Sequence, residues 1–314
     1  MLRVLFQYEA GPNMAAKLDR LKDQNLDIDV VPPQDQARFG SCLQEADVVW
    51  HVLQPITEKM IRSASKLRLI QKIGVGVNTI DLETAEACGI AVCNMPGTNS
   101  RAVAEMTLTL MLGAMRRITY LDRATHAGNW HVPPDVHETF GEIHGRTVGF
   151  FGYGATARIL TPILKSMGAR LIYTATSPKS GVDAEWRDFS ALTREADIIS
   201  LHAPLTPDTA GVFDATAIRS MKPGVIIVNT ARGELIDQAA LVQALLDGHV
   251  GAAGLDVFAS EPIDKSEKIL QFENVVVAPH VSWLTSETLD RSLGVAAENC
   301  RRLLANETLI HRVR

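Results

Sequence analysis

Three side chains with complementary chemistry follow predicted strands in the second half of the sequence. Glu261 lies 29 positions after Arg232, and His280 lies 19 positions after Glu261. In open α/β sheets, ligands bind beyond the carboxyl ends of the strands. An arginine fork binds a carboxylate or carbonyl through two N–H bonds, and a histidine beside a carboxylate transfers a proton near neutral pH. Taken singly, a Pro-His or a Glu-Pro is usually structural, but the three together are hard to explain by packing alone.

A glycine-rich turn joins a buried strand to a helix in the middle of the chain. The run Thr147–Phe151 precedes Gly152-Tyr153-Gly154, and a helix is expected to begin near Ala155. Such glycines allow a sharp turn and a close approach to a pyrophosphate, which the positive end of the helix dipole attracts. Ala157 stands where the dinucleotide fingerprint usually has a third glycine. Because glycine turns are also a common structural device, this motif alone leaves cofactor binding open.

Apolar runs typical of strands alternate with segments of helical periodicity along the whole chain. This alternation predicts parallel strands joined by right-handed crossovers. We therefore expect two Rossmann- or flavodoxin-like, doubly wound parallel-sheet α/β domains with an active-site cleft between them. The first comprises residues 1–98 and, through a returning last helix, 286–314; the second comprises 99–285. The expected strands are Leu2–Phe6, Ile28–Val31, Asp47–Trp50, Leu69–Ile73, Ile90–Cys93, Val148–Phe151, Arg170–Tyr173, Ile198–Leu201, Val225–Asn229, Ala253–Asp256 and Val275–Ala278.

One predicted helix, Arg101–Tyr120, is apolar on most of its faces. A helix that is apolar all round requires burial on more than one side. It is either a connecting helix packed between domains or subunits, or an ordinary core helix.

Composition narrows the class of function. The chain of 314 residues is 46% hydrophobic and 21% charged, with a net charge of −5. This is the balance of a soluble globular protein, and its mild acidity gives no general attraction for nucleic acid. Met1–Phe6 lacks the apolar core of a signal peptide, and the most apolar helical stretch is too short to cross a bilayer. The four cysteines show no metal-ligand spacing, so we expect reduced core thiols in a cytoplasmic protein without bound metal.

A series of motifs follows in a fixed order along nearly the whole chain. They are Lys72–Asp81, Asn94–Asn99, Val103–Glu105, Gly152–Gly154, His202–Thr206, Asn229–Gly233, Gly254–Phe258, Glu261-Pro262 and Pro279-His280. Together they resemble the D-isomer-specific 2-hydroxyacid dehydrogenases. The tryptophan at position 283, shortly after His280, resembles the pattern of a branch of the family that acts on hydroxypyruvate and glyoxylate-like substrates. So many ordered matches are far more specific than any one motif.

The resemblance implies a catalytic set for hydride transfer. Arg232 matches the arginine that holds a 2-oxo acid, His280 the general acid/base, and Glu261 the acid that pairs with this histidine. Reduction leaves an alkoxide that must be protonated as the hydride arrives, and a histidine paired with a carboxylate suits this task.

The resemblance also implies substrate and cofactor contacts. Backbone N–H groups of Val75 and Gly76 match a loop that binds the substrate carboxylate, with a plain turn as the alternative. Asn78 stands where the family more often has an acid. Asp256 matches the acceptor of the nicotinamide carboxamide or simply caps a loop, and Trp283 lines the substrate pocket or packs in the core. The expected cofactor contacts are Gly152, Tyr153, Gly154, Ala155, Thr156, Thr107, Thr176, Ser177, Lys179, His202, Ala203, Pro204, Thr230, Ala231 and Asp256.

The loop after Tyr173 bears on the choice of nicotinamide cofactor. NAD enzymes place an acid about twenty residues after the glycines, to bind the adenine ribose. Here the sequence Thr174–Ser180 contains no acid, and the first one is Asp183. Hydroxyls and a lysine suit a 2′-phosphate, so the loop favours NADP(H) modestly over NAD(H), with Thr176, Ser177 and Lys179 as candidate contacts. NADP-preferring relatives often have an arginine in this loop, which is absent here, and a solvated loop in an NAD enzyme is the alternative.

The sequence therefore predicts an NAD(P)H-dependent oxidoreductase that reversibly converts a small 2-oxo acid to a D-2-hydroxy acid. The alternative is a catalytically quiet, NAD(P)-sensing binding protein like the corepressors that share this fold, because such relatives can keep the catalytic residues. Formate or phosphite as substrate is a third possibility that no residue marks. The family is commonly dimeric, and Arg101–Tyr120 with the loop around Trp130 and Pro133-Pro134 is the candidate homodimer contact.

Overall fold

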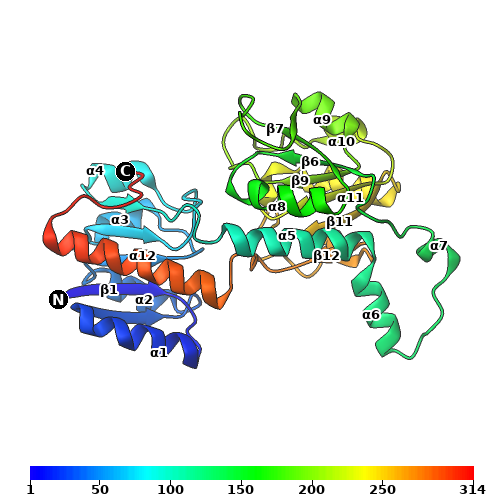
Figure 1. Ribbon diagram of the computed structural model, residues 1–314. Coiled ribbons are helices and arrows are strands. Elements are labelled where there is room, and N and C mark those ends of the chain that lie inside the picture. Colours follow the sequence, from blue (N-terminus) through cyan, green and yellow to red (C-terminus); the bar gives the residue numbers. More distant parts are fainter. The chain divides into compact units, whose positions relative to one another are not determined.

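The computed structural model describes residues 1–314 and divides into two compact units (Figure 1). Unit 1 comprises residues 1–99 and 285–314, and unit 2 comprises residues 100–284. Each unit has its own parallel sheet with helices on both faces, so the prediction of two parallel-sheet α/β domains is confirmed. None of the helices combines the length and the apolar character that a membrane span requires.

Unit 1 contains a five-stranded parallel sheet in the order β2-β1-β3-β4-β5. Its strands are β1 (Leu2–Gln7), β2 (Leu26–Val31), β3 (Val48–His51), β4 (Leu69–Lys72) and β5 (Ala91–Cys93), and its helices are α1 (Pro12–Leu21), α2 (Gln36–Leu43), α3 (Glu58–Ser63), α4 (Leu82–Ala87) and α12 (Ser286–Ala305). Successive strand residues point to opposite faces. Ile70 joins the core under α2, α3 and α4, whereas Oε1 of the adjacent Gln71 accepts from Asn299 Nδ2 of α12 at 2.6 Å. Helix α12 therefore covers the opposite face.

Unit 2 contains a seven-stranded parallel sheet in the order β12-β11-β10-β9-β6-β7-β8. Its strands are β6 (Thr147–Phe151), β7 (Arg170–Thr174), β8 (Glu185–Trp186), β9 (Ile198–Leu201), β10 (Val225–Asn229), β11 (Val250–Leu255) and β12 (Val275–Val277). Its helices are α5 (Ser100–Met115), α6 (Ile118–His126), α7 (Pro134–His137), α8 (Ala155–Ser166), α9 (Phe189–Glu195), α10 (Ala215–Arg219) and α11 (Gln238–Leu246). The chain runs from β6 to β8 in one direction and from β9 to β12 in the other. The order thus reverses between β6 and β9, where such sheets bind ligands.

The two faces of this sheet carry separate cores. Leu192, Ile218 and Leu241 of α9, α10 and α11 pack on one face. Leu110 of α5 and Leu160 of α8 pack on the other. Because both faces are buried, the inner strands β6, β9, β10 and β11 have no polar face, which explains their near-continuous apolar sequences.

The expected single helix over 101–120 is wrong, because α5 ends at Met115 and α6 begins at Ile118. Arg117 adopts a left-handed conformation (φ 52°) between them, which stops the helix. Helix α5 buries residues along its length, including Leu110 and Met111, whereas no residue of α6 is buried. The helix therefore ends where its burial ends.

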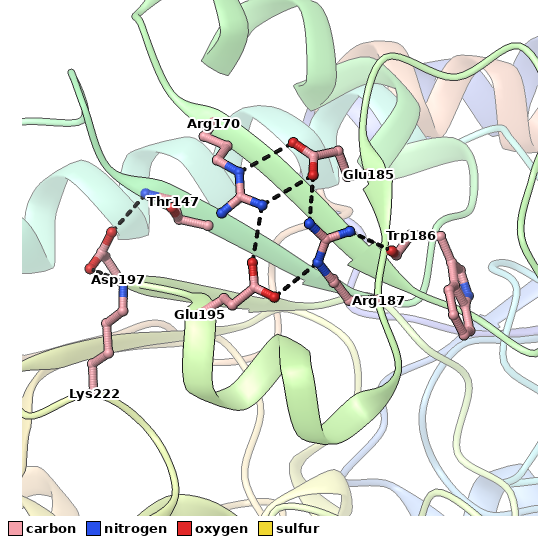
Figure 2. Close-up of polar contacts among 8 residues, drawn as sticks. All are labelled: Thr147, Arg170, Glu185, Trp186, Arg187, Glu195, Asp197 and Lys222. Carbon is pink, nitrogen blue, oxygen red and sulfur yellow. Dashed lines mark hydrogen bonds and ion pairs between the residues drawn. The ribbon is translucent and has the colours of Figure 1, made fainter.

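Strand β8 was not predicted, and ion pairs hold it at the sheet edge. Figure 2 shows Arg170 and Arg187 each contacting both Glu185 of β8 and Glu195 of α9, with N–O distances of 2.6–3.1 Å. Both residues of β8 are exposed, so the strand has no apolar alternation that a sequence pattern could reveal. Charges also protect an edge strand from pairing with other chains.

The four cysteines differ in burial. Cys93 and Cys300 are buried, Cys42 is half-buried and Cys88 is exposed, and all four are unpaired. The expectation of four core thiols is thus wrong for Cys88. Burial raises the pKa of Cys93 to about 11 and that of Cys300 to about 12, so both are protonated thiols at neutral pH.

Candidate active site

The three residues expected to act together follow three neighbouring strands of unit 2. Arg232 comes after β10, Glu261 after β11 and His280 after β12, and these strands lie side by side in the sheet. His280 Nδ1 lies 2.6 Å from Glu261 Oε2. The two side chains expose only 18% and 32% of their surface, respectively, so their hydrogen bond is partly shielded from water. This leaves Nε2 of the imidazole as the nitrogen that can exchange a proton with a ligand.

Glu261 is held as a carboxylate by several donors. Its Oε1 accepts from the backbone N–H of Phe258 at 2.9 Å, while Oε2 faces His280. Burial alone would raise the pKa of Glu261, but the hydrogen bond and charge of His280, the Phe258 N–H and the charge of Arg232 together lower it. The carboxyl group is therefore ionised at neutral pH and acts as the acceptor in its hydrogen bond with Nδ1 of His280.

Asp256 fixes the chain that carries His280. Its buried carboxylate accepts from the backbone N–H groups of Val281 (Oδ1, 2.8 Å) and Ser282 (Oδ2, 2.9 Å). The backbone N–H of His280 donates to the carbonyl oxygen of Asp256 at 2.8 Å. His280 has a positive φ of 56°, a conformation that a non-glycine residue keeps only when its surroundings hold it. Three hydrogen bonds to Asp256 supply this restraint.

Trp283 lies in the same turn as His280. Its indole Nε1 donates to the carbonyl oxygen of His280 at 3.1 Å, and the side chain is half-buried. The structure thus brings it close to His280, as a pocket wall would require, while its contact with substrate stays a prediction.

Arg232 is held by contacts that the sequence did not reveal. Asn229, the last residue of β10, donates from Nδ2 to the carbonyl oxygen of Arg232 at 2.8 Å and accepts from the N–H of Ala231 at 3.0 Å. A Cβ at Gly233 would overlap the carbonyl of Phe258, so only glycine lets this loop pack against the segment that precedes Glu261. The only feature of the sequence that could have indicated a role for Asn229 is its polar side chain at the end of an otherwise apolar strand.

The guanidinium of Arg232 is largely buried. It donates through Nη1 to the carbonyl oxygen of Ala231 at 2.6 Å. Burial lowers its pKa, and the nearby charges of Glu234 and Glu261 oppose this effect. Arginine stays charged in such surroundings and presents a planar set of donors, which suits a carboxylate or carbonyl oxygen.

The glycine turn after β6 fits a dinucleotide. Gly152 has φ 91°, and a Cβ there would lie 2.6 Å from the backbone nitrogen of Ala203, so this glycine packs against the loop after β9. A Cβ at Gly154 would meet no protein atom within 4 Å. Gly154 caps α8 without a side-chain hydrogen bond, which leaves the first N–H groups of the helix, including those of Ala155 and Thr156, to bind an anion. The turn therefore combines open space with free donors, as a pyrophosphate requires.

Other expected cofactor contacts border the same sheet edge. The hydroxyls of Thr107 in α5 and Thr230 after β10 form a hydrogen bond of 2.8 Å. This bond brings together two expected cofactor contacts that lie 123 positions apart in the sequence. His202, after β9, contacts the hydroxyl of Ser200 through Nε2 at 2.8 Å. Burial lowers the pKa of His202 to about 4, so this histidine is neutral at pH 7. In the same loop, the carbonyl oxygen of Pro204 accepts from the hydroxyl of Thr209 at 2.8 Å.

The loop after β7 is fixed by two aromatic side chains. The backbone N–H of Lys179 donates to the hydroxyl of Tyr173 at 2.6 Å, and Trp186 Nε1 donates to the carbonyl oxygen of Ala175 at 3.3 Å. The side chains of Thr176, Ser177 and Lys179 are exposed on this loop. The sequence did not predict the hydrogen bond from Trp186, because it did not predict strand β8, to which this residue belongs.

The glycine loop expected to bind a carboxylate lies in unit 1, after β4. Gly74 has φ 146° and accepts through its carbonyl from the N–H of Met95 at 2.8 Å. The carbonyl of Val75 accepts from Asn94 Nδ2 at 2.9 Å, and the Val75 side chain is 43% exposed. The loop therefore has a defined shape, and the binding of a carboxylate by the N–H groups of Val75 and Gly76 stays a prediction.

Comparison with known proteins adds a family match. The family model described as "D-isomer specific 2-hydroxyacid dehydrogenase, NAD binding domain" matches residues 108–282. Over 294 residues the chain is 37% identical to a D-3-phosphoglycerate dehydrogenase of Mycobacterium leprae, covering 91% of this chain and 54% of that protein. The chain thus spans about half the length of that relative.

Two further matches extend over nearly the full length of both chains. A glyoxylate reductase of Aeropyrum pernix is 35% identical over 306 residues, covering 95% of this chain and 91% of that protein. The crystal structure of the TT0316 protein from Thermus thermophilus superposes with a TM-score of 0.91 at 31% identity, covering 100% of each chain.

Proposed function

The chain belongs to the D-isomer specific 2-hydroxyacid dehydrogenase family, and we propose that it catalyses the reversible, NAD(P)H-dependent reduction of a 2-oxo acid to a D-2-hydroxy acid. The observation that carries this proposal is the contact of 2.6 Å between His280 and Glu261, at the same sheet edge as Arg232. A proton donor, its charged partner and a binder of oxyanions are the groups that this reduction needs.

His280 supplies the proton in the direction of reduction. A reduced nicotinamide cofactor held by the turn after β6 would supply the hydride for the new C–H bond at the carbonyl carbon of the substrate. The carbonyl oxygen then takes a proton from Nε2 of His280, and the imidazole becomes neutral. Glu261 stabilises the charged imidazole before this transfer and keeps the ring oriented through Nδ1. In the direction of oxidation, neutral His280 accepts the hydroxyl proton.

Arg232 binds the carboxylate and carbonyl oxygens of the substrate. Its guanidinium polarises the carbonyl and stays charged throughout the reaction. We assign binding of a carboxylate also to the backbone N–H groups of Val75 and Gly76, and a pocket-lining role to Trp283. The glyoxylate reductase of Aeropyrum pernix makes glyoxylate and the larger 2-oxo acid hydroxypyruvate the first substrates to test.

The cofactor in this proposal is NADP(H) in preference to NAD(H). The loop after β7 presents Thr176, Ser177 and Lys179 and no acid. The two carboxylates that follow in the sequence both form ion pairs. Asp183 pairs with Lys165 at 2.9 Å. Glu185 pairs with Arg170 and Arg187 (Figure 2). No unpaired carboxylate next to the loop would repel a 2′-phosphate.

Absorbance of the reduced nicotinamide provides the test. Glyoxylate, hydroxypyruvate, pyruvate and bulkier 2-oxo acids are added to the wild-type protein with NADPH or NADH, and to the His280→Ala variant. We expect oxidation with at least one acid, faster with NADPH, and a loss of about a hundredfold or more in the variant. A wild-type protein that binds the cofactor but oxidises it with none of these acids would overturn the assignment in favour of a sensing protein.

The proposal includes a homodimer formed through unit 2. Trp130 is 89% exposed and Ile118 is 52% exposed, both in the segment between α5 and β6. Aromatic side chains such as Trp130 are enriched at protein interfaces. Sedimentation at micromolar concentration tests the assembly, and a monomer there would contradict it. A cytoplasmic location belongs to the same proposal, since unpaired cysteines suit a reducing compartment.

A further inference from the structure

We propose that Arg158 of α8, together with Lys179, binds the 2′-phosphate of NADP(H) and sets the preference for this cofactor. This inference rests on the proposed function, since it concerns the adenosine end of the same cofactor. It supplies the arginine that the loop after β7 lacks, from a different element of the fold.

Arg158 lies in the first turn of α8, next to the anion-binding turn at Gly154. Its side chain is exposed, and its guanidinium forms no ion pair or hydrogen bond within the protein; its one partner is the ring of Tyr153, at 5.6 Å from the centroid. A cation in the first turn of a helix lies at the positive end of the helix dipole, which is unfavourable unless an anion is near. An anionic ligand at this end of α8 would remove that conflict.

A pair of aromatic rings in tilted contact links Arg158 to the loop after β7. The ring of Tyr153 lies 4.4 Å from that of Tyr173, and the Tyr173 hydroxyl accepts from the backbone N–H of Lys179. The hydroxyl of Tyr153 is fixed in turn by Thr161 at 2.7 Å, so the ring cannot swing away. Because its guanidinium lies over Tyr153, Arg158 is directed to the β7 side of α8, where the adenine ribose of a dinucleotide binds in such sheets.

Neither cation on this side forms an ion pair within the protein that would compete with an anionic ligand. Lys179 is exposed and forms no ion pair, while Asp183, the nearest acid in the sequence, is engaged by Lys165. A phosphate monoester carries up to two negative charges and several acceptor oxygens, which an arginine fork and a lysine can share. Arg158 and Lys179 thus approach one phosphate from a helix and from a loop held by Tyr173 and Trp186.

Binding of nucleotide fragments tests this without any turnover. The affinities of adenosine 2′,5′-bisphosphate and of adenosine 5′-diphosphate are measured by calorimetry for the wild type, Arg158→Gln and Lys179→Gln. We expect each variant to weaken the 2′,5′-bisphosphate at least tenfold and the 5′-diphosphate less than twofold. Arg219→Gln, which removes an exposed cation from α10 on the opposite face of the sheet, is the matched control and should change neither affinity.

Kinetics with both cofactors separate this inference from the proposed function. Arg158→Gln should raise KM for NADPH at least tenfold and leave KM for NADH unchanged, which also shows that the variant is folded. If the wild type reduces 2-oxo acids and Arg158→Gln keeps the same NADPH-to-NADH ratio, the inference about Arg158 is wrong and the proposed function stands. If the wild type reduces no 2-oxo acid, yet the bisphosphate still depends on Arg158, the proposed function is wrong and the phosphate site stands.

Discussion

Oε2 of Glu261 lies 2.6 Å from Nδ1 of His280, although 19 residues separate them in the sequence. The contact depends on two supports: the Phe258 N–H holds the other carboxylate oxygen, and Asp256 holds the backbone that follows His280. The geometry of the histidine is thus set by neighbouring strand ends and not by its own segment alone. Substitutions of Glu261 and Asp256 can be made separately. They distinguish a residue that assists proton transfer from one that only positions His280.

Glu261→Gln should lower kcat about a hundredfold with little change in KM for the cofactor. Glutamine retains a hydrogen-bonding side chain of the same size but no charge to stabilise the protonated imidazole. Steady-state absorbance of the reduced nicotinamide measures kcat and KM for both proteins. Asp264→Asn removes a nearby exposed carboxylate that binds only Ser266, and it should leave the rate unchanged.

Asp256→Asn should cost both stability and rate. The asparagine side chain has one acceptor oxygen for the two N–H groups of Val281 and Ser282, so a buried donor loses its partner at a cost of about 1–3 kcal/mol. Loosening of this turn should lower kcat, since His280 is then less well positioned. Urea denaturation and steady-state kinetics measure the two effects. A rise in KM for the cofactor alone, with stability intact, would instead indicate that Asp256 acts only on the nicotinamide carboxamide.

Much of the fold could be predicted from the sequence, because parallel strands buried on both faces leave a strong apolar pattern. Strands such as Val225–Asn229 stand out for this reason, and the helices between them follow from periodicity. The apolar pattern does not reveal elements whose residues are exposed to solvent. Strand β8 consists of two exposed residues held by ion pairs, and the break at Arg117 is a change in backbone conformation that apolar spacing does not record.

The same contrast applies to the candidate site. Arg232, Glu261 and His280 could be placed at one sheet edge because each follows a strand, and the structure brings the last two into contact. The roles of Asn229 and Gly233 could not be predicted, since they arise from contacts of a side chain and of a missing Cβ across the fold. Charge and turn chemistry mark the residues that meet a ligand, whereas the residues that hold them in place become visible only in three dimensions.

The two glycines of the turn after β6 should respond differently to alanine. Gly152→Ala introduces a Cβ 2.6 Å from the backbone of Ala203 at a positive φ, so we expect a loss of stability of roughly 1–3 kcal/mol or more. Gly154→Ala meets no protein atom and should fold with a stability within about 1 kcal/mol of the wild type. Its methyl group would occupy space needed by a pyrophosphate, so cofactor affinity should fall at least tenfold. Thermal unfolding and NADPH fluorescence titration check the pair; unaltered NADPH binding by Gly154→Ala would place the pyrophosphate elsewhere.

His202 should make the stability of unit 2 depend on pH. Burial lowers its pKa from 6.5 to about 4, so between these values the unfolded chain binds a proton that the folded chain does not. The free energy of unfolding should therefore fall as the pH drops through this window, by at most about 1.4 kcal/mol per pH unit from this group. His202→Gln keeps a polar partner for Ser200 and does not titrate, so its stability should decline less between pH 6.5 and 4.5. Urea denaturation monitored by tryptophan fluorescence measures the slopes.

Two other histidines serve as references for this slope. Burial and the charge of Lys72 lower the pKa of His51 in unit 1 as well, so the His202 variant should keep part of the acid sensitivity. His126, whose side chain is 82% exposed, provides the matched control: His126→Gln should show the wild-type slope. Equal slopes for the wild type and His202→Gln would mean that His202 is already solvated in the folded protein, and would leave the acid sensitivity to His51 and the carboxylates.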